Sequence, residues 1–185
     1  DGQLNWSWSD YPYGYVSGGL RQAPNPISKV RCGGANVFTA QSGYDTGPHI
    51  WLRRHHPADG SVMWSVDLSQ MWTTSSGWHH TNLQFQLINA TADTVLVVAD
   101  VGLGSHTAQM TLDHSGAMIG ANLENQGVAA ACWMDSNNLV YIATGATPNA
   151  GGQMVTQRNR DLSFPGFTTT ISDTTFVPTS LRVSG

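Results

Sequence analysis

The sequence is poor in charged side chains. Only 11% of its 185 residues are Asp, Glu, Lys or Arg, whereas an ordinary soluble domain has about 25%. Lys29 is the sole lysine and Glu124 the sole glutamate. Helix surfaces usually rely on Lys and Glu, so their near absence argues against helices. The Thr, Val, Trp and Tyr content favours strands instead, and we expect an all-β protein.

Other absences narrow the classes of function. The net charge of −4 provides no basic footprint, so we expect no nucleic-acid partner. No stretch approaches the roughly 18 consecutive apolar residues of a membrane-spanning helix. The chain starts at Asp1 without a methionine, as a processed protein or a piece of a longer one would. The polar, lysine-poor composition predicts an extracellular or cell-surface location.

Cysteine is scarce as well. Cys32 and Cys132 are the two cysteines of the chain, and each precedes a turn that leads into an apolar strand. Residues at similar places in separate repeats need not approach within the roughly 7 Å between Cα atoms that a disulfide requires. We favour buried, unbridged side chains over a disulfide.

What the sequence does contain is an internal repeat. Residues 1–7 read DGQLNWS, and residues 59–65 read DGSVMWS. Residues 113–119 repeat the turn and the strand start without the tryptophan, and residues 160–164 are a more diverged copy. Repetition at such a spacing predicts one supersecondary unit stacked on copies of itself, with function carried by loops.

Three complete units can be aligned within one domain spanning residues 1–185, at approximately 28–69, 82–124 and 127–171. Each contains four short strands separated by Gly, Asp and Asn turns. In the first unit we expect strands at 28–32, 37–40, 49–56 and 61–68, with a loop at 41–48; the last strand of the third unit is expected at 162–171. Four strands in about 40–50 residues are typical of a blade of a β-propeller. A β-sandwich of regular hairpins is the alternative.

The segment Asn36-Val37-Phe38-Thr39-Ala40, followed by residues 59–65, resembles the bacterial SBBP-type β-propeller repeats and, more loosely, PQQ-type repeats. The resemblance covers residues 28–171 and is best in the first unit, whereas the third unit lacks the turn glycine and the tryptophan. It implies four-stranded antiparallel blades in a secreted or surface protein. It implies no particular activity, and we expect no cofactor.

The number of units is smaller than a closed propeller needs. Residues 1–9 read as the outer strand of an incomplete blade, and three complete units fall short of the roughly four to eight blades of closed rings. The chain could be a section of a longer polypeptide, a subunit of an oligomer that completes the ring, or an open module. We expect the partner to be a second copy or the remainder of a larger chain.

Two pairs of adjacent histidines suggest a metal site at first sight, because imidazole is a common ligand of transition metals. Neighbouring residues of a strand point to opposite faces, so such a pair cannot chelate one ion alone. No H-x-H or H-E-x-x-H spacing accompanies them. We therefore predict no metal site, with weak candidates at His55, His56, His79 and His80.

The acidic residues give no clear sign of catalysis. Asp59, Asp93, Asp113 and Asp135 fall in predicted turns, where aspartate is favoured for local hydrogen bonds. A glycoside hydrolase or lyase would need two converging carboxylates, and the best-placed acids are those near strand ends: Asp45, Asp67 and Asp100. No G-x-S-x-G nucleophile elbow is present, and we predict no catalytic residue.

Two aromatic inserts are the best candidates for binding. One contains Tyr11, Tyr13 and Tyr15; the other contains Trp72, Trp78, His79 and His80. Aromatic residues anchor protein interfaces and can stack on sugar rings, but they could equally fill gaps between blades, as we expect of Trp6 and Trp64. The sequence thus predicts a non-catalytic, self-associating structural or surface subunit. A carbohydrate-binding, lectin-like module is the alternative, and a glycoside hydrolase or lyase the second one.

Overall fold

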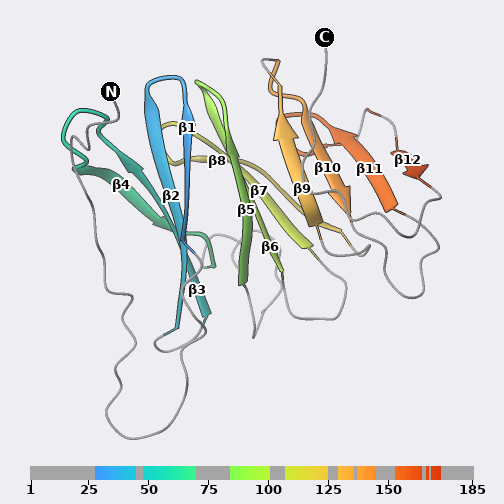
Figure 1. Ribbon diagram of the computed structural model, residues 1–185, viewed down its shortest axis with the longest axis horizontal. Coiled ribbons are helices and arrows are strands. Elements are labelled where there is room, and N and C mark those ends of the chain that lie inside the picture. Colours follow the sequence, from blue (N-terminus) through green and yellow to red (C-terminus); the bar gives the residue numbers. More distant parts are fainter. Residues whose placement is uncertain are drawn as a thin grey trace, which may run out of the picture.

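The computed structural model describes residues 28–44, 48–69, 84–100, 107–124, 129–135, 137–144, 153–163, 166 and 168–171. Within these residues the protein is all-β, with three four-stranded antiparallel sheets that follow one another along the long axis (Figure 1). The predicted fold class is confirmed, and the sheets are compatible with propeller-like blades.

Within each sheet, the four strands are consecutive in the sequence and neighbouring strands are paired in sequence order. The first sheet contains β1 (Ser28–Gly33), β2 (Asn36–Tyr44), β3 (Pro48–His55) and β4 (Val62–Asp67). The second contains β5 (Gln84–Ala90), β6 (Thr94–Asp100), β7 (Thr107–Asp113) and β8 (Met118–Glu124). The third contains β9 (Ala129–Met134), β10 (Val140–Thr144), β11 (Gln153–Arg158) and β12 (Thr168–Ile171). The predicted units each supply one sheet.

Two predicted boundaries are wrong. The loop expected from residue 41 begins later, because β2 continues to Tyr44, which pairs with Pro48 of β3. The strand expected from residue 162 begins at Thr168 instead. Leu162 lies in a turn with a φ of 62°, a left-handed conformation that a strand cannot contain.

The second sheet is covered on both faces. Along β6, alternate side chains point to opposite sides, so Val95 and Val97 pack against the first sheet, while Leu96 and Val98 pack toward the third. All four are fully buried. The first core also contains Phe38, Ala40, Ile50, Leu52, Leu68, Ile88, Ala99, Ala108, Met110 and Leu112; the second also contains Met134, Val140, Ile142 and Leu162. β6 therefore lies between the two cores and contributes side chains to each of them.

The leading strands of the three sheets are neighbours. β5 contacts both β1 and β9, so the first strand of each sheet lies beside the first strand of the next. Propeller blades are arranged in this way, with one edge of every blade directed toward a shared axis.

Polar contacts join the first sheet to turns of the second. Trp64 packs on Phe38, with ring centroids 6.0 Å apart, and its Nε1–H donates to the carbonyl oxygen of His114 at 2.8 Å. Arg54 Nη1 donates to the same oxygen at 2.7 Å, and Asn36 Nδ2 donates to the carbonyl of Ala92 at 3.0 Å. As predicted, Trp64 lies between two sheets; Trp6 is outside the described residues.

Similar contacts join the second sheet to the third. The hydroxyl of Thr111 donates to the carbonyl of Arg160 at 2.6 Å, and the hydroxyl of Thr91 donates to Asn138 Oδ1 at 2.7 Å. Arg160 Nη2 donates back to the carbonyl of Asp93 at 3.1 Å. The turns of neighbouring sheets are thus linked to one another, which fixes how the sheets are stacked.

Cys32 and Cys132 form no disulfide with each other. Cys132, on β9, is half-buried and packs beside the second core. Cys32 is exposed, so its predicted burial is wrong. It lies on β1, which is an edge strand of the first sheet, and an edge strand leaves more of its side chains open to water.

Candidate interaction surface

The aromatic inserts are not placed by the structure. Tyr11, Tyr13, Tyr15, Trp72, Trp78, His79 and His80 all lie outside the described residues. Their roles as interface anchors or sugar-stacking residues stay predictions. The described residues that could take part in binding are the turns at the ends of the sheets and the exposed sheet edges.

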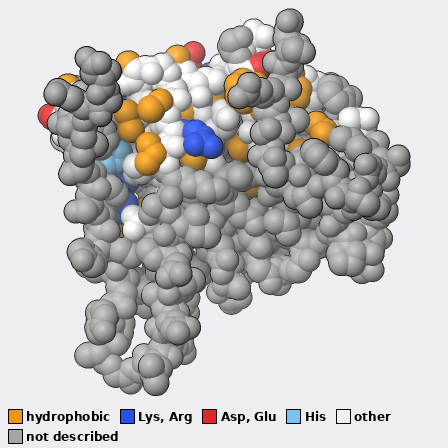
Figure 2. Space-filling model, viewed as in Figure 1, with side chains coloured by type: hydrophobic (Ala, Val, Ile, Leu, Met, Phe, Trp, Pro, Cys, Tyr) orange, Lys and Arg blue, Asp and Glu red, His pale blue; other side chains and the backbone are white. Residues whose placement is uncertain are grey.

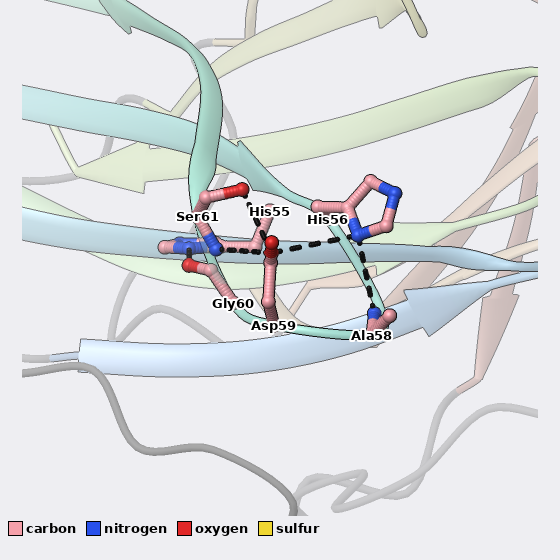
Figure 3. A network of polar contacts seen from close by, with 6 residues as sticks. All are labelled: His55, His56, Ala58, Asp59, Gly60 and Ser61. Carbon is pink, nitrogen blue, oxygen red and sulfur yellow. Dashed lines mark hydrogen bonds and ion pairs between the residues drawn. The ribbon is translucent and has the colours of Figure 1, made fainter.

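His55 has a structural environment. Its side chain is fully buried, and Nδ1 lies 3.0 Å from the carbonyl of Gly60 (Figure 3). Nε2 lies 2.9 Å from the hydroxyl of Thr39. A carbonyl oxygen can only accept, so Nδ1 carries the proton and Nε2 accepts from the hydroxyl. In this arrangement both nitrogens are engaged, and His55 holds the β3–β4 turn against β2.

His56, the residue after β3, is directed away from the buried site of His55. Its ring is exposed, and Nδ1 accepts from the backbone N–H of Ala58 at 3.3 Å and lies 3.4 Å from Asp59 Oδ1 (Figure 3). The side chains of His55 and His56 therefore contact different partners. Among the described residues, no group of three His, Cys, Asp or Glu side chains could hold a metal ion.

Three turns share an Asp-x-Ser motif, at Asp59, Asp113 and Asp161. In each, Oδ1 accepts from the backbone N–H and from the hydroxyl of the serine two residues later. The two distances are 2.9 and 2.8 Å in the first turn, 2.8 and 2.6 Å in the second, and 3.0 and 2.5 Å in the third. Asp135 makes a related turn, accepting from the N–H groups of residues 137 and 139. The predicted turn roles of Asp59, Asp113 and Asp135 are confirmed, and Asp161 is an additional case.

These hydrogen bonds favour the ionised carboxylates. They lower the pKa of Asp59 below its ordinary value, mainly through the serine N–H and then through the serine hydroxyl. For Asp113 and Asp161 the serine hydroxyl is the largest cause of the lowered pKa, and backbone N–H groups add to it. A general acid needs a raised pKa, so these three residues are suited to holding turns rather than to donating protons.

Of the three acids predicted near strand ends, the described two each end a strand. Asp67 ends β4, and its Oδ1 accepts from the N–H of Ser69 at 3.0 Å. Asp100 ends β6. Asp45 is outside the described residues. Asp93 is exposed in the β5–β6 turn.

A feature missed from the sequence is the exposed apolar edge of the first sheet. Val62 and Met63, at the start of edge strand β4, are 43% and 49% exposed, and Val30 on edge strand β1 is 54% exposed. Figure 2 shows that described hydrophobic side chains reach the surface in small groups set among polar atoms. The sequence predicted a strand at 61–68, but not that its adjacent apolar residues Val62 and Met63 would both be exposed.

Neither the known protein-family models nor the curated proteins contain a match to this chain. Within the described residues, no helix is long and apolar enough to span a membrane. The repeated four-stranded antiparallel sheets are compatible with propeller-like blades.

Proposed function

We propose that this chain is a non-catalytic, extracytoplasmic interaction module of propeller-type blades that associates with copies of itself. The observation that carries the proposal is the stack of three four-stranded sheets. Closed propellers usually contain about four to eight blades. Among the described residues, the first and third sheets each share a core with the second sheet only, which is compatible with a further sheet on the other face of each.

The edge of the first sheet supports the same proposal. Among the described strands, β4 pairs with β3 alone, and unpaired strand edges are ready templates for pairing with another chain. Many proteins protect such an edge with lysine or proline, whereas β4 begins with exposed Val62 and Met63. We infer that this edge is part of the contact between copies.

Multi-angle light scattering across a concentration series tests the proposal. Self-association predicts a mass that rises from that of one 19.9 kDa chain to a defined multiple of it. A monomeric mass at every concentration, up to the highest that stays in solution, would contradict the proposed function.

A charged variant tests the contribution of the edge. Met63→Lys places an ammonium group on β4 and should shift the association to higher concentration, because burying an unpaired charge is costly. Ala35→Lys is the matched control, since Ala35 is also exposed but lies in the β1–β2 turn. Equal association of the two variants and the unmodified protein would place the contact elsewhere.

A further inference from the structure

Two neighbouring polar side chains are buried between the second and third sheets. Thr107 and Gln109 lie two positions apart on β7, and both are fully buried. Strand alternation directs them toward the third sheet, because Ala108 between them packs in the first core. Thr111, on the same face of β7, donates to the carbonyl of Arg160 in the β11–β12 turn at 2.6 Å. Polar side chains therefore continue along this face, beside the apolar second core.

Neither side chain has its full set of hydrogen bonds. Among the described residues, the hydroxyl of Thr107 and Nε2 of Gln109 have no hydrogen-bond partner. The other end of the amide is engaged, since Oε1 of Gln109 accepts from Nδ2 of Asn122 at 3.3 Å. Most buried polar atoms in proteins have a partner, either in the protein or in ordered water. Two such groups side by side on one face indicate a bound molecule.

The first sheet shows that these two positions need not be polar. A register shift marks the same point in both third strands, after Arg54 in β3 and after Thr111 in β7. Counted back from that point, the two polar positions of β7 correspond to Ile50 and Leu52 of β3. Both of these are fully buried apolar residues of the first core. The polar pair is thus a feature of the junction between the second and third sheets rather than a requirement of the repeat.

The chemistry of the two groups favours water as the bound molecule. A hydroxyl donates or accepts, and an amide presents either a donor or an acceptor according to how it is turned; water serves every one of these roles. An anion would be costly in a fully buried place without a counter-charge. The strands β6, β7 and β8 contain no Lys, Arg or His, and Arg158 of β11 donates to the carbonyl of Leu162 at 3.2 Å.

We propose that the hydroxyl of Thr107 and Nε2 of Gln109 bind one ordered water molecule between the second and third sheets. Positions two apart on a strand are separated by about 6.7 Å, and each hydrogen bond to the water spans about 2.8–3.0 Å, so one molecule can reach both side chains. Immobilising a water costs less free energy than leaving two buried polar groups unpaired. The site does not depend on whether the chain self-associates.

A crystal structure at high resolution is the direct test. Spherical electron density within about 3.2 Å of both atoms is the expected result. The proposal is overturned by the absence of density there, by density too large for one water molecule, or by a group of the chain that bonds to the two atoms instead.

Apolar variants test the site in solution, by thermal unfolding followed by circular dichroism. Thr107→Val keeps the shape of the side chain and removes one partner of the water, so the melting temperature should fall by roughly 2–12 °C. Thr111→Val is the matched control on the same face, because it loses the hydrogen bond to the carbonyl of Arg160 and sets the scale for one such bond. A Thr107→Val protein that melts above the unmodified one would show that the hydroxyl is buried without a partner, against the proposal.

A double variant tests whether one molecule is shared. Gln109→Leu also removes the hydrogen bond to Asn122, so its effect alone is ambiguous. If both side chains bind the same water, the decrease in melting temperature for Thr107→Val combined with Gln109→Leu is smaller than the sum of the two single decreases, since the first change already releases the water. Strictly additive decreases would contradict a shared water molecule.

Discussion

At Gly120 the backbone of the second sheet approaches the third sheet so closely that no β-carbon fits. A Cβ built on Gly120 would lie 2.1 Å from the carbonyl oxygen of Asp161 and 2.4 Å from the carbonyl carbon, whereas carbon atoms in contact are normally about 3.5–4.0 Å apart. Gly120→Ala therefore requires the β11–β12 turn to move by more than an ångström. That turn is held by Thr111, which donates to the carbonyl of Arg160.

The size of the effect follows from the nature of the obstacle. Overpacking a well-packed site costs about 1–3 kcal/mol, and Gly120→Ala should be at the upper end because the obstacle is backbone rather than a flexible side chain. For a chain of this length, each kcal/mol lowers the melting temperature by about 2–4 °C. A cost of about 3 kcal/mol thus predicts a decrease of roughly 6–12 °C, measured by thermal unfolding followed by circular dichroism.

Gly34→Ala is the control for the loss of a glycine as such. Gly34 has a φ of +59°, and its Cβ would meet Ala92, at 3.3 Å from Cβ and 3.4 Å from Cα. The expected cost there is the left-handed penalty of about 1–2 kcal/mol. A melting temperature for Gly120→Ala within about 2 °C of the unmodified protein, which is below 1 kcal/mol, would refute the close-approach argument. So would a cost no larger than that of Gly34→Ala.

Two further predictions concern the turns. Leu162 is buried in the second core yet has a φ of 62°, so Leu162→Ala should cost about 2–5 kcal/mol in urea unfolding; Leu162→Gly loses the same packing but relieves the left-handed strain of about 1–2 kcal/mol. The glycine variant should thus be the more stable of the two, and the reverse order would contradict the strain. The lowered pKa values of Asp59, Asp113 and Asp161 stabilise the fold above the ordinary aspartate pKa, and this stabilisation is lost as the pH falls below about 4. Unfolding measured between pH 6 and 3 should show a steeper loss in the unmodified protein than in the triple Asp→Asn variant, and parallel curves would contradict this role.

The sequence predicted the sheets well because their signals are local. Apolar runs such as residues 95–99 and turn residues such as Gly60 and Gly116, both with positive φ, mark strands and hairpins without knowledge of the rest of the chain. The end of β2 was missed because Ser42 and Gly43 have weak strand preference. Their pairing with Ile50 and His49 of β3 keeps them in the ladder, and that pairing is a tertiary effect.

Leu162 shows a different limit of prediction. An apolar residue after an aspartate reads as the start of a strand, and only the packed structure places it in a left-handed turn with its side chain in the second core. The polar links between sheets, such as that from Arg54 to the carbonyl of His114, join residues 60 positions apart. No local pattern could reveal them.

The candidate functional residues also differ in whether a local pattern could predict their role. The local turn roles of the aspartates could be predicted because an aspartate bonds to groups two residues away. By contrast, positions 100, 107 and 124 are neighbours only through the pairing register of β6, β7 and β8. No local pattern in the sequence relates them. Asp100 was singled out only as an acid at a strand end.

The second sheet is covered on both faces and supports both of its neighbours. Because β6 supplies side chains to both cores, the first and third sheets are joined through the second, and among the described residues they share no core of their own. In such a linear array, stability is a sum of units and nearest-neighbour contacts. An outer sheet can detach while its counterpart stays folded, but loss of the second sheet removes the partner of both. Transient opening, and with it proteolytic attack, should therefore begin at the outer sheets and reach the second sheet last.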